Sequence, residues 1–341
     1  MNATVERVDH ANKKRSAKDY ASDQDVRWCP GCGDYAILKA VQKTLADLAA
    51  DPAQTVFISG IGCSSRFPYY MSTYGFHTIH GRAPAVATGV KIANPELDVW
   101  MVTGDGDGLS IGGNHLLHVL RRNVNMQILL FNNEVYGLTK GQYSPTSKPG
   151  MHSPSTPRGS LDAPTNPALF ALGAGAHFVA RAVDTMAKHL PEVLKRAHAH
   201  QGAGFVEILQ NCIVYNDGVF NNVTAKATAA DRQLLLEHGK PLRYGSDNQY
   251  GLRLNHRTLA LESVVLGEEG VTEDDLLVHD ETNPTLASLL ARLSDPMPLG
   301  VLYCNPGESY EQKVRADRGA GGPVSGDQLN ALLRQGKTWT V

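Results

Sequence analysis

The chain has 341 residues, enough for one large domain or two modest ones. Its 32 lysines and arginines nearly balance its 34 aspartates and glutamates, so its charge favours neither a nucleic-acid nor a membrane partner. The apolar runs are far shorter than the roughly 18 residues of a membrane span, and the N-terminus lacks the apolar core of a signal peptide. Five cysteines are too few and too dispersed for a disulfide framework. We therefore expect a soluble cytoplasmic protein.

Short apolar runs alternate with stretches of helical periodicity along the first two thirds of the chain. A helix is expected at 34–50, directly after the sequence Cys-Pro-Gly-Cys-Gly. Further helices are expected at 83–93, 109–121 and 185–200, and strands at 55–59, 97–103, 126–131, 177–180 and 204–209. This alternation indicates parallel βαβ units with right-handed crossovers. Ligands bind such sheets at the carboxyl ends of the strands, so the loops after 59, 103, 131 and 209 are the expected site.

The rest of the chain is less regular. Residues 144–167 form a long, polar, proline-rich segment, and a loop of this length is usually functional or disordered. Beyond residue 225 we expect only a short helix at 231–238, a strand at 250–254 and a helix at 285–293. The predicted organisation is an N-terminal arm (1–25), an α/β domain (26–225) with helices on both faces of a parallel sheet, and an irregular C-terminal extension (226–341) that wraps the domain or a neighbouring chain.

Polar residues follow two neighbouring strands of the predicted sheet. Gly104-Asp105-Gly106-Asp107 comes directly after one strand, and Asn132-Asn133 follows the next. Glycines let backbone N–H groups approach a phosphate, and a hard divalent cation prefers oxygen ligands. Asp105, Asn133 and the carbonyl of Val135 could therefore hold Mg²⁺, with diphosphate oxygens completing an octahedron. Each motif alone could be a plain turn, but together at one sheet edge they indicate a site.

Four of the cysteines fall where the sheet would bring them together. Cys29 and Cys32 are two residues apart, whereas Cys63 and Cys212 each follow a predicted strand. Such a set could hold a tetrahedral zinc ion or an iron–sulfur cluster, and the close pair could be a thioredoxin-type redox pair. Structural zinc usually uses two close pairs, so two isolated cysteines favour a cluster. The fifth, Cys304, is more typical of a buried strand.

Together these motifs resemble the β subunit of 2-oxoacid:ferredoxin oxidoreductases over roughly residues 26–225. The matching segments are 28–35, 60–65, 80–83, 104–107 and 136–142, and the Gly-Asp-Gly and Asn-Asn pair is the fingerprint of thiamine-diphosphate enzymes. The resemblance implies a thiamine-diphosphate-binding domain, Mg²⁺ and one [4Fe–4S] cluster held by Cys29, Cys32, Cys63 and Cys212. It also implies a cofactor pocket lined by Ile61, Gly62, Cys63, Ser64, His80, Gly106, Asp107, Gly137, Leu138 and Thr139. Asp107 could instead cap the following helix.

The resemblance implies a reaction and partners. A 2-oxoacid would be oxidatively decarboxylated with coenzyme A, and electrons would pass through the cluster to ferredoxin, reversibly in principle. The chain carries only one diphosphate-type domain, so a separate α subunit is expected to supply the rest of the site in an (αβ)₂ assembly. The β chain alone should then be inactive.

Two cations are candidates for contacts to the substrate carboxylate, Arg66 and Lys140. A guanidinium suits a second carboxylate because its planar fork can bind both oxygens, although both cations could also be solvated loop charges. Residues 60–70 also resemble the 2-oxoglutarate branch of the family, so we expect a 2-oxoglutarate:ferredoxin oxidoreductase (2-oxoglutarate synthase) that forms succinyl-CoA and CO₂. The alternatives are a pyruvate or broad-range enzyme, a non-oxidative thiamine decarboxylase or synthase, and a zinc-stabilised, non-catalytic scaffold subunit.

Overall fold

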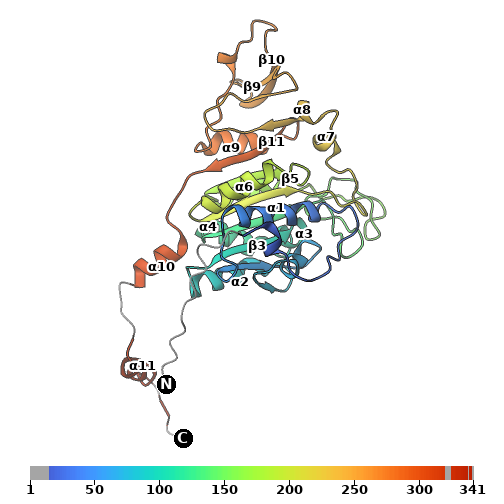
Figure 1. The fold of residues 1–341 in the computed structure, drawn as a ribbon. Coiled ribbons are helices and arrows are strands. Elements are labelled where there is room, and N and C mark those ends of the chain that lie inside the picture. Colours follow the sequence, from blue (N-terminus) through green and yellow to red (C-terminus); the bar gives the residue numbers. More distant parts are fainter. Residues whose placement is uncertain (1–14, 319–323, 337, 340–341) are drawn as a thin grey trace.

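The computed structural model describes residues 15–318, 324–336 and 338–339, and its body is a layered α/β domain (Figure 1). The central sheet has eight strands in the order β2-β1-β3-β4-β6-β5-β11-β7. Every neighbouring pair is parallel except β11 with β5. The strands are β1 Thr55–Ser59, β2 Tyr74–His77, β3 Asp98–Gly104, β4 Met126–Asn132, β5 Phe178–Val183, β6 Ala203–Leu209, β7 Gln233–Leu235 and β11 Met297–Cys304.

Helices cover both faces of this sheet, as the sequence predicts. The covering helices are α1 Asp34–Asp47, α2 Ala83–Ala93, α4 Gly113–Arg122, α5 Pro167–Gly173, α6 His189–Ala199 and α9 Pro284–Ala291. Side chains alternate across β4: Ile128 and Leu130 pack with α2, α4, α5 and α9, whereas Leu129 and Phe131 pack with α1 and α6. The central strands are thus buried on both sides, which is the reason for their continuous apolar runs.

Most of the expected elements are confirmed with small changes at their ends. The expected helix at 109–121 is divided into α3 Asp105–Leu109 and α4, and sequence reasoning missed the 3₁₀ segment η2 Ser64–Tyr70, the edge strand β2 and the short helix α5. The expected helix at 231–238 is wrong. A single turn, α8 Ala229–Arg232, leads instead into β7, because parallel pairing with β11 buries Leu234 completely.

The chain after residue 225 contributes to the main sheet and also forms separate structure. It supplies β7 and β11, and a three-stranded antiparallel sheet of β8 Arg243–Tyr244, β9 Tyr250–Asn255 and β10 Ala260–Val265, which lies beyond β11 (Figure 1). The expected strand at 250–254 and helix at 285–293 correspond to β9 and α9. The remaining elements are η1 Ala17–Tyr20, α7 Asn221–Thr224, η3 Glu273–Asp275, α10 Tyr310–Arg318 and α11 Gly326–Leu333.

Part of the predicted N-terminal arm packs on the domain. Tyr20 is fully buried in the same core cluster as α1, and its hydroxyl donates to the carbonyl of Ala50 at 2.6 Å. Residues 1–14, the rest of that arm, lie outside the described residues. Among the residues that the structure describes, no helix has the length and apolarity needed to cross a membrane.

The strand register brings the carboxyl ends of the central strands together. Ser59 of β1 pairs with Val102 of β3, Gly104 pairs with Phe131 of β4, and Asn132 pairs with Leu209 of β6. The loops after these strands therefore leave the sheet at one edge, as the sequence predicts.

Candidate active site

Asp105 is a buried carboxylate held by hydroxyl groups. It opens α3 directly after β3 and is only 2% exposed. Its Oδ2 accepts hydrogen bonds from Ser144 Oγ at 2.5 Å and Thr146 Oγ1 at 2.6 Å. Burial raises the pKa of Asp105 to about 6, even though these hydrogen bonds favour the charged form. A cation beside Asp105 would offset the cost of burying its charge.

Asn133 and Val135 lie on the loop after β4 and face the same hollow as Asp105. The Asn133 amide donates from Nδ2 to Gln210 Oε1 at 2.7 Å, and its Oδ1 accepts from the Val135 N–H at 3.2 Å. The three residues together offer carboxylate, amide and backbone oxygens. This donor set fits a hard divalent cation such as Mg²⁺.

All of the residues predicted to hold thiamine diphosphate or Mg²⁺ line one hollow of about 520 Å³. They are Ile61, Gly62, Cys63, Ser64, His80, Asp105, Gly106, Asp107, Asn133, Val135, Gly137, Leu138 and Thr139. Sequence reasoning missed three other lining residues, Gly104, Phe131 and Tyr136. Gly104 and Phe131 lie at strand ends beside the recognised motifs, and Tyr136 belongs to the recognised segment 136–142. Their positions in the sequence could therefore have identified them as lining residues.

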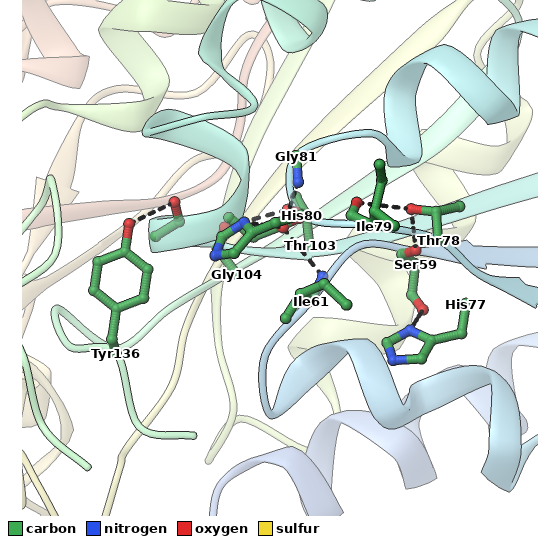
Figure 2. Close-up of polar contacts among 12 residues, drawn as sticks. Ser59, Ile61, His77, Thr78, Ile79, His80, Gly81, Thr103, Gly104 and Tyr136 are labelled. Atoms are coloured by element: carbon green, nitrogen blue, oxygen red, sulfur yellow. Dashed lines mark hydrogen bonds and ion pairs between the residues drawn. The ribbon is translucent and has the colours of Figure 1, made fainter. Parts of the chain in front are cut away.

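Asp107 ties together the loops around this hollow. Its Oδ1 accepts from the N–H groups of Ile61 (3.1 Å) and Gly81 (2.7 Å) and lies 2.7 Å from Nδ1 of His80. Its Oδ2 accepts from Thr103 Oγ1 at 2.7 Å. Figure 2 shows Ile61, His80, Gly81 and Thr103 converging on one point. The expectation that Asp107 could cap a helix is wrong, because it lies inside α3 and binds other loops.

Gly106 has no room for a side chain. A Cβ there would lie 2.2 Å from the ring of Tyr136, whose hydroxyl donates to the Gly106 carbonyl at 2.9 Å. We expect Gly106→Ala to lower the free energy of unfolding by about 1–3 kcal/mol and to weaken thiamine diphosphate binding at least about 10-fold. Urea unfolding and calorimetric titration of the cofactor measure both effects.

Gly89→Ala is the matched control for this prediction. Gly89 lies in α2, and a Cβ there would meet nothing within 4 Å. The control is expected to keep wild-type cofactor affinity and to gain up to about 1 kcal/mol of stability. Wild-type affinity and stability in Gly106→Ala would show that Tyr136 moves aside freely.

A second hollow, of about 700 Å³, adjoins the first. The four cysteines Cys29, Cys32, Cys63 and Cys212 all line it, and Cys63, Asn133, Gly137 and Leu138 line both hollows. A Cβ on Gly137 would lie 3.4 Å from Cys63 Sγ and 3.6 Å from Cys212 Sγ, so the Gly137 backbone lies beside both sulfurs. Cys304 lies apart on β11, with its sulfur 4.0 Å from Nδ1 of His200.

The four thiols line one hollow, and burial affects at least two of them. In the described part of the chain, no three His, Cys, Asp or Glu side chains converge closely enough to hold one metal ion. Burial is the largest influence on Cys63 and raises the pKa of its thiol to about 12; it also raises the pKa of Cys32. Thiolates in such a place need positive charge beside them, which the irons of a cluster supply.

Asp34 is a buried carboxyl group that sequence reasoning missed. It opens α1, lines the four-cysteine hollow and is only 1% exposed. Burial, followed by the nearby charge of Asp184, raises the pKa of Asp34 to about 7. The position of Asp34, one glycine after the second cysteine of the close pair, was the available clue.

The two predicted cations are placed differently. Arg66 lines the four-cysteine hollow and also a wider open one of about 1080 Å³ next to it, and Arg27, which sequence reasoning missed, lines both as well. Lys140 is exposed and is not among the residues that line these hollows. The structure therefore brings Arg66, but not Lys140, to the cysteine hollow.

Comparison with known proteins identifies the class. Residues 60–208 match the family model of the thiamine pyrophosphate enzymes, C-terminal TPP binding domain. This match runs from the loop after β1 into β6 and includes the loops that form the first hollow. The chain thus carries a binding domain of the thiamine pyrophosphate enzyme class.

The full-length relatives identify the family. The chain is 49% identical to the 2-oxoglutarate oxidoreductase subunit KorB of Mycobacterium tuberculosis, over 100% of this chain and 91% of the relative. It is 38% identical to the 2-oxoacid:ferredoxin oxidoreductase 2 subunit beta of Aeropyrum pernix, over 88% and 87% of the two chains. A solved 2-oxoglutarate:ferredoxin oxidoreductase from Magnetococcus marinus, with 2-oxoglutarate, coenzyme A and succinyl-CoA bound, matches with a TM-score of 0.74 at 35% identity, covering 94% of this chain and 97% of that chain. The chain belongs to the β subunits of 2-oxoacid:ferredoxin oxidoreductases, in the KorB-like branch.

Proposed function

We propose that this subunit serves a 2-oxoglutarate:ferredoxin oxidoreductase, which converts 2-oxoglutarate and coenzyme A to succinyl-CoA and CO₂. The observation that carries the proposal is the junction of the two hollows, where Cys63, Asn133, Gly137 and Leu138 line both. A group bound in the first hollow would lie beside a cluster bound in the second. That arrangement suits the transfer of electrons from a thiamine-bound substrate.

The residues of this chain have distinct tasks in the proposed reaction. Bound thiamine diphosphate would supply the nucleophilic carbon and the electron sink for decarboxylation, and the [4Fe–4S] cluster would accept electrons singly. Asp105, Asn133 and the Val135 carbonyl would hold Mg²⁺ at the diphosphate. Asp107 keeps the loops of Ile61 and His80 in place through its contacts to both.

The proposed partners are a separate α subunit, in an (αβ)₂ assembly, and ferredoxin as the electron acceptor. The KorB relative is named as a subunit, which supports an enzyme made of more than one kind of chain. Exposed apolar side chains near the first hollow also fit a covering subunit: Ile79 beside His80 is 69% exposed, and Ile111 and Leu138 are exposed as well. These side chains would be buried when the α subunit completes the site.

The substrate assignment predicts a selective role for Arg66. With the α subunit present, Arg66→Met is expected to raise the KM for 2-oxoglutarate at least about 10-fold, because the second carboxylate loses a charged hydrogen-bond partner. The KM for pyruvate, which lacks that carboxylate, should change much less. Anaerobic viologen reduction with each oxoacid, with and without coenzyme A, measures both values.

Lys140→Met is the comparison variant, because Lys140 is exposed and away from these hollows. It is expected to change either KM by less than Arg66→Met does. If the wild-type enzyme preferred pyruvate, the assignment of 2-oxoglutarate as substrate would be contradicted, whereas the assignment to the 2-oxoacid:ferredoxin oxidoreductases would stand. Zinc in place of iron and acid-labile sulfide would contradict the cluster and favour the scaffold alternative.

A further inference from the structure

Gln210 connects the two hollows. It follows β6 directly, is 1% exposed, and lines the four-cysteine hollow. Its Oε1 accepts from Asn133 Nδ2 at 2.7 Å, and its Nε2 donates to the Asn211 carbonyl at 2.6 Å and to Cys32 Sγ at 3.3 Å. One buried amide thus contacts an expected Mg²⁺ ligand and an expected cluster ligand.

The Asn211 carbonyl determines which way the side-chain amide of Gln210 is oriented. A carbonyl oxygen only accepts hydrogen bonds, so the NH₂ group of Gln210 must face it. The oxygen of Gln210 then faces Asn133, which must present its own NH₂ group in return. The carbonyl oxygen of Asn133 is consequently directed away from Gln210 and stays available as a metal ligand.

Gln210 is held on rigid backbone. Its N–H donates to the Asn132 carbonyl at 2.9 Å and so extends the pairing of β4 with β6 by one residue. The next residue, Asn211, accepts from the Gly33 N–H at 3.2 Å and donates its own N–H to Asp184 Oδ2 at 2.9 Å. These bonds fasten the start of α1, just after Cys32, to the end of β6.

We propose that Gln210 is a positioning residue for both cofactors: it orients the Asn133 amide toward Mg²⁺ and donates an N–H···S hydrogen bond to the Cys32 thiolate of the cluster. The proposal rests on the proposed function, which places the two groups in these hollows. A hydrogen bond to a cluster sulfur stabilises the more negative, reduced cluster and therefore raises its reduction potential. Outer partners of metal ligands typically affect metal affinity 10–100-fold.

Two substitutions separate the two roles. Gln210→Met is similar in length but offers neither the acceptor for Asn133 nor the donor for Cys32. Gln210→Glu keeps an acceptor for Asn133 in either protonation state. Even a protonated glutamic acid has only one hydrogen to offer, and the Asn211 carbonyl, the shorter contact, takes it. The bond to Cys32 is then lost in both variants.

The test uses the αβ complex purified anaerobically, with calorimetric titration of thiamine diphosphate and Mg²⁺ and an EPR-monitored redox titration of the cluster. Gln210→Met is expected to weaken cofactor binding about 10–100-fold and to shift the cluster to a lower potential. Gln210→Glu is expected to keep cofactor affinity close to wild type and still show the lower potential. Gln127→Met, which removes a buried glutamine at the start of β4, is the matched control and should change neither value.

Each contrary result overturns a defined part of the proposal. Wild-type cofactor affinity in Gln210→Met would overturn the orienting role, and an unshifted potential in both Gln210 variants would overturn the N–H···S bond. A wild-type complex without iron, or without affinity for thiamine diphosphate, would overturn the proposed function itself and the role of Gln210 with it.

Discussion

Cys212→Ser is expected to abolish the [4Fe–4S] cluster while leaving the fold intact. Cys212 follows β6 on a surface loop and lines the hollow with the other three cysteines, so its loss removes one anchor and no core packing. A serine hydroxyl stays protonated at neutral pH and is a poor ligand for the irons of a cluster. Iron and acid-labile sulfide should fall to near zero, the brown absorbance should disappear, and far-ultraviolet circular dichroism should be unchanged.

Cys304→Ser is the matched control for the cluster prediction. Cys304 lies on β11 beside His200 and is not among the residues that line the four-cysteine hollow. This variant is expected to keep full iron content. An intact cluster in Cys212→Ser would place the fourth ligand elsewhere, and loss of iron in Cys304→Ser would bring the fifth cysteine into the site.

Asp105→Asn is expected to separate cofactor binding from stability. Loss of the anionic ligand should weaken thiamine diphosphate and Mg²⁺ binding by at least about 100-fold, which calorimetry measures. Without cofactor, the variant should be more stable than wild type at pH 7. The pKa of Asp105 is raised from about 4 in the unfolded chain to about 6 in the folded chain, so at pH 7 its ionisation lowers the free energy of unfolding by on the order of 2 kcal/mol, a cost that the neutral amide avoids.

The stability gain should shrink as the pH falls from about 6 and should be gone below about 4, where the carboxyl group is protonated in the unfolded chain as well. Asp107→Ala is the comparison and should have the opposite effect on stability. It leaves the buried N–H groups of Ile61 and Gly81 without their shared acceptor, at a cost of about 3 kcal/mol. Wild-type cofactor affinity in Asp105→Asn would contradict the metal assignment.

The sequence predicted the central sheet and the members of the first hollow because both depend on local patterns. The apolar runs of β3 and β4 are bounded by Gly104 and Asn132-Asn133, and the alternation of strands and helices determines that these ends meet. The same reasoning predicted that the four cysteines lie close to one another. The contacts of individual side chains could not be predicted from such patterns. Asp105, for example, is held by Ser144 and Thr146, which lie on a loop with no periodicity.

The remaining differences have tertiary causes. β7 was expected as a helix because Leu234 and its neighbours suit either structure, and its pairing with β11 decides between them. Gln210 drew no attention in the sequence, since a single glutamine after a strand is chemically ordinary. Its importance arises from Asn133 and Cys32, which the fold brings to it from distant parts of the chain.

The antiparallel strand β11 also determines when this subunit can be completed during synthesis. β11 pairs along β5 between Phe178 and Arg181, yet it is translated after the small antiparallel sheet and α9. Until then β5 is an unpaired edge, and Cys29 leaves the ribosome long before the sheet beneath Cys212 is finished. All four cysteines are translated before β11, so they are present while β5 is still an exposed edge. We expect the proposed cluster to be inserted only after β11 has paired with that edge.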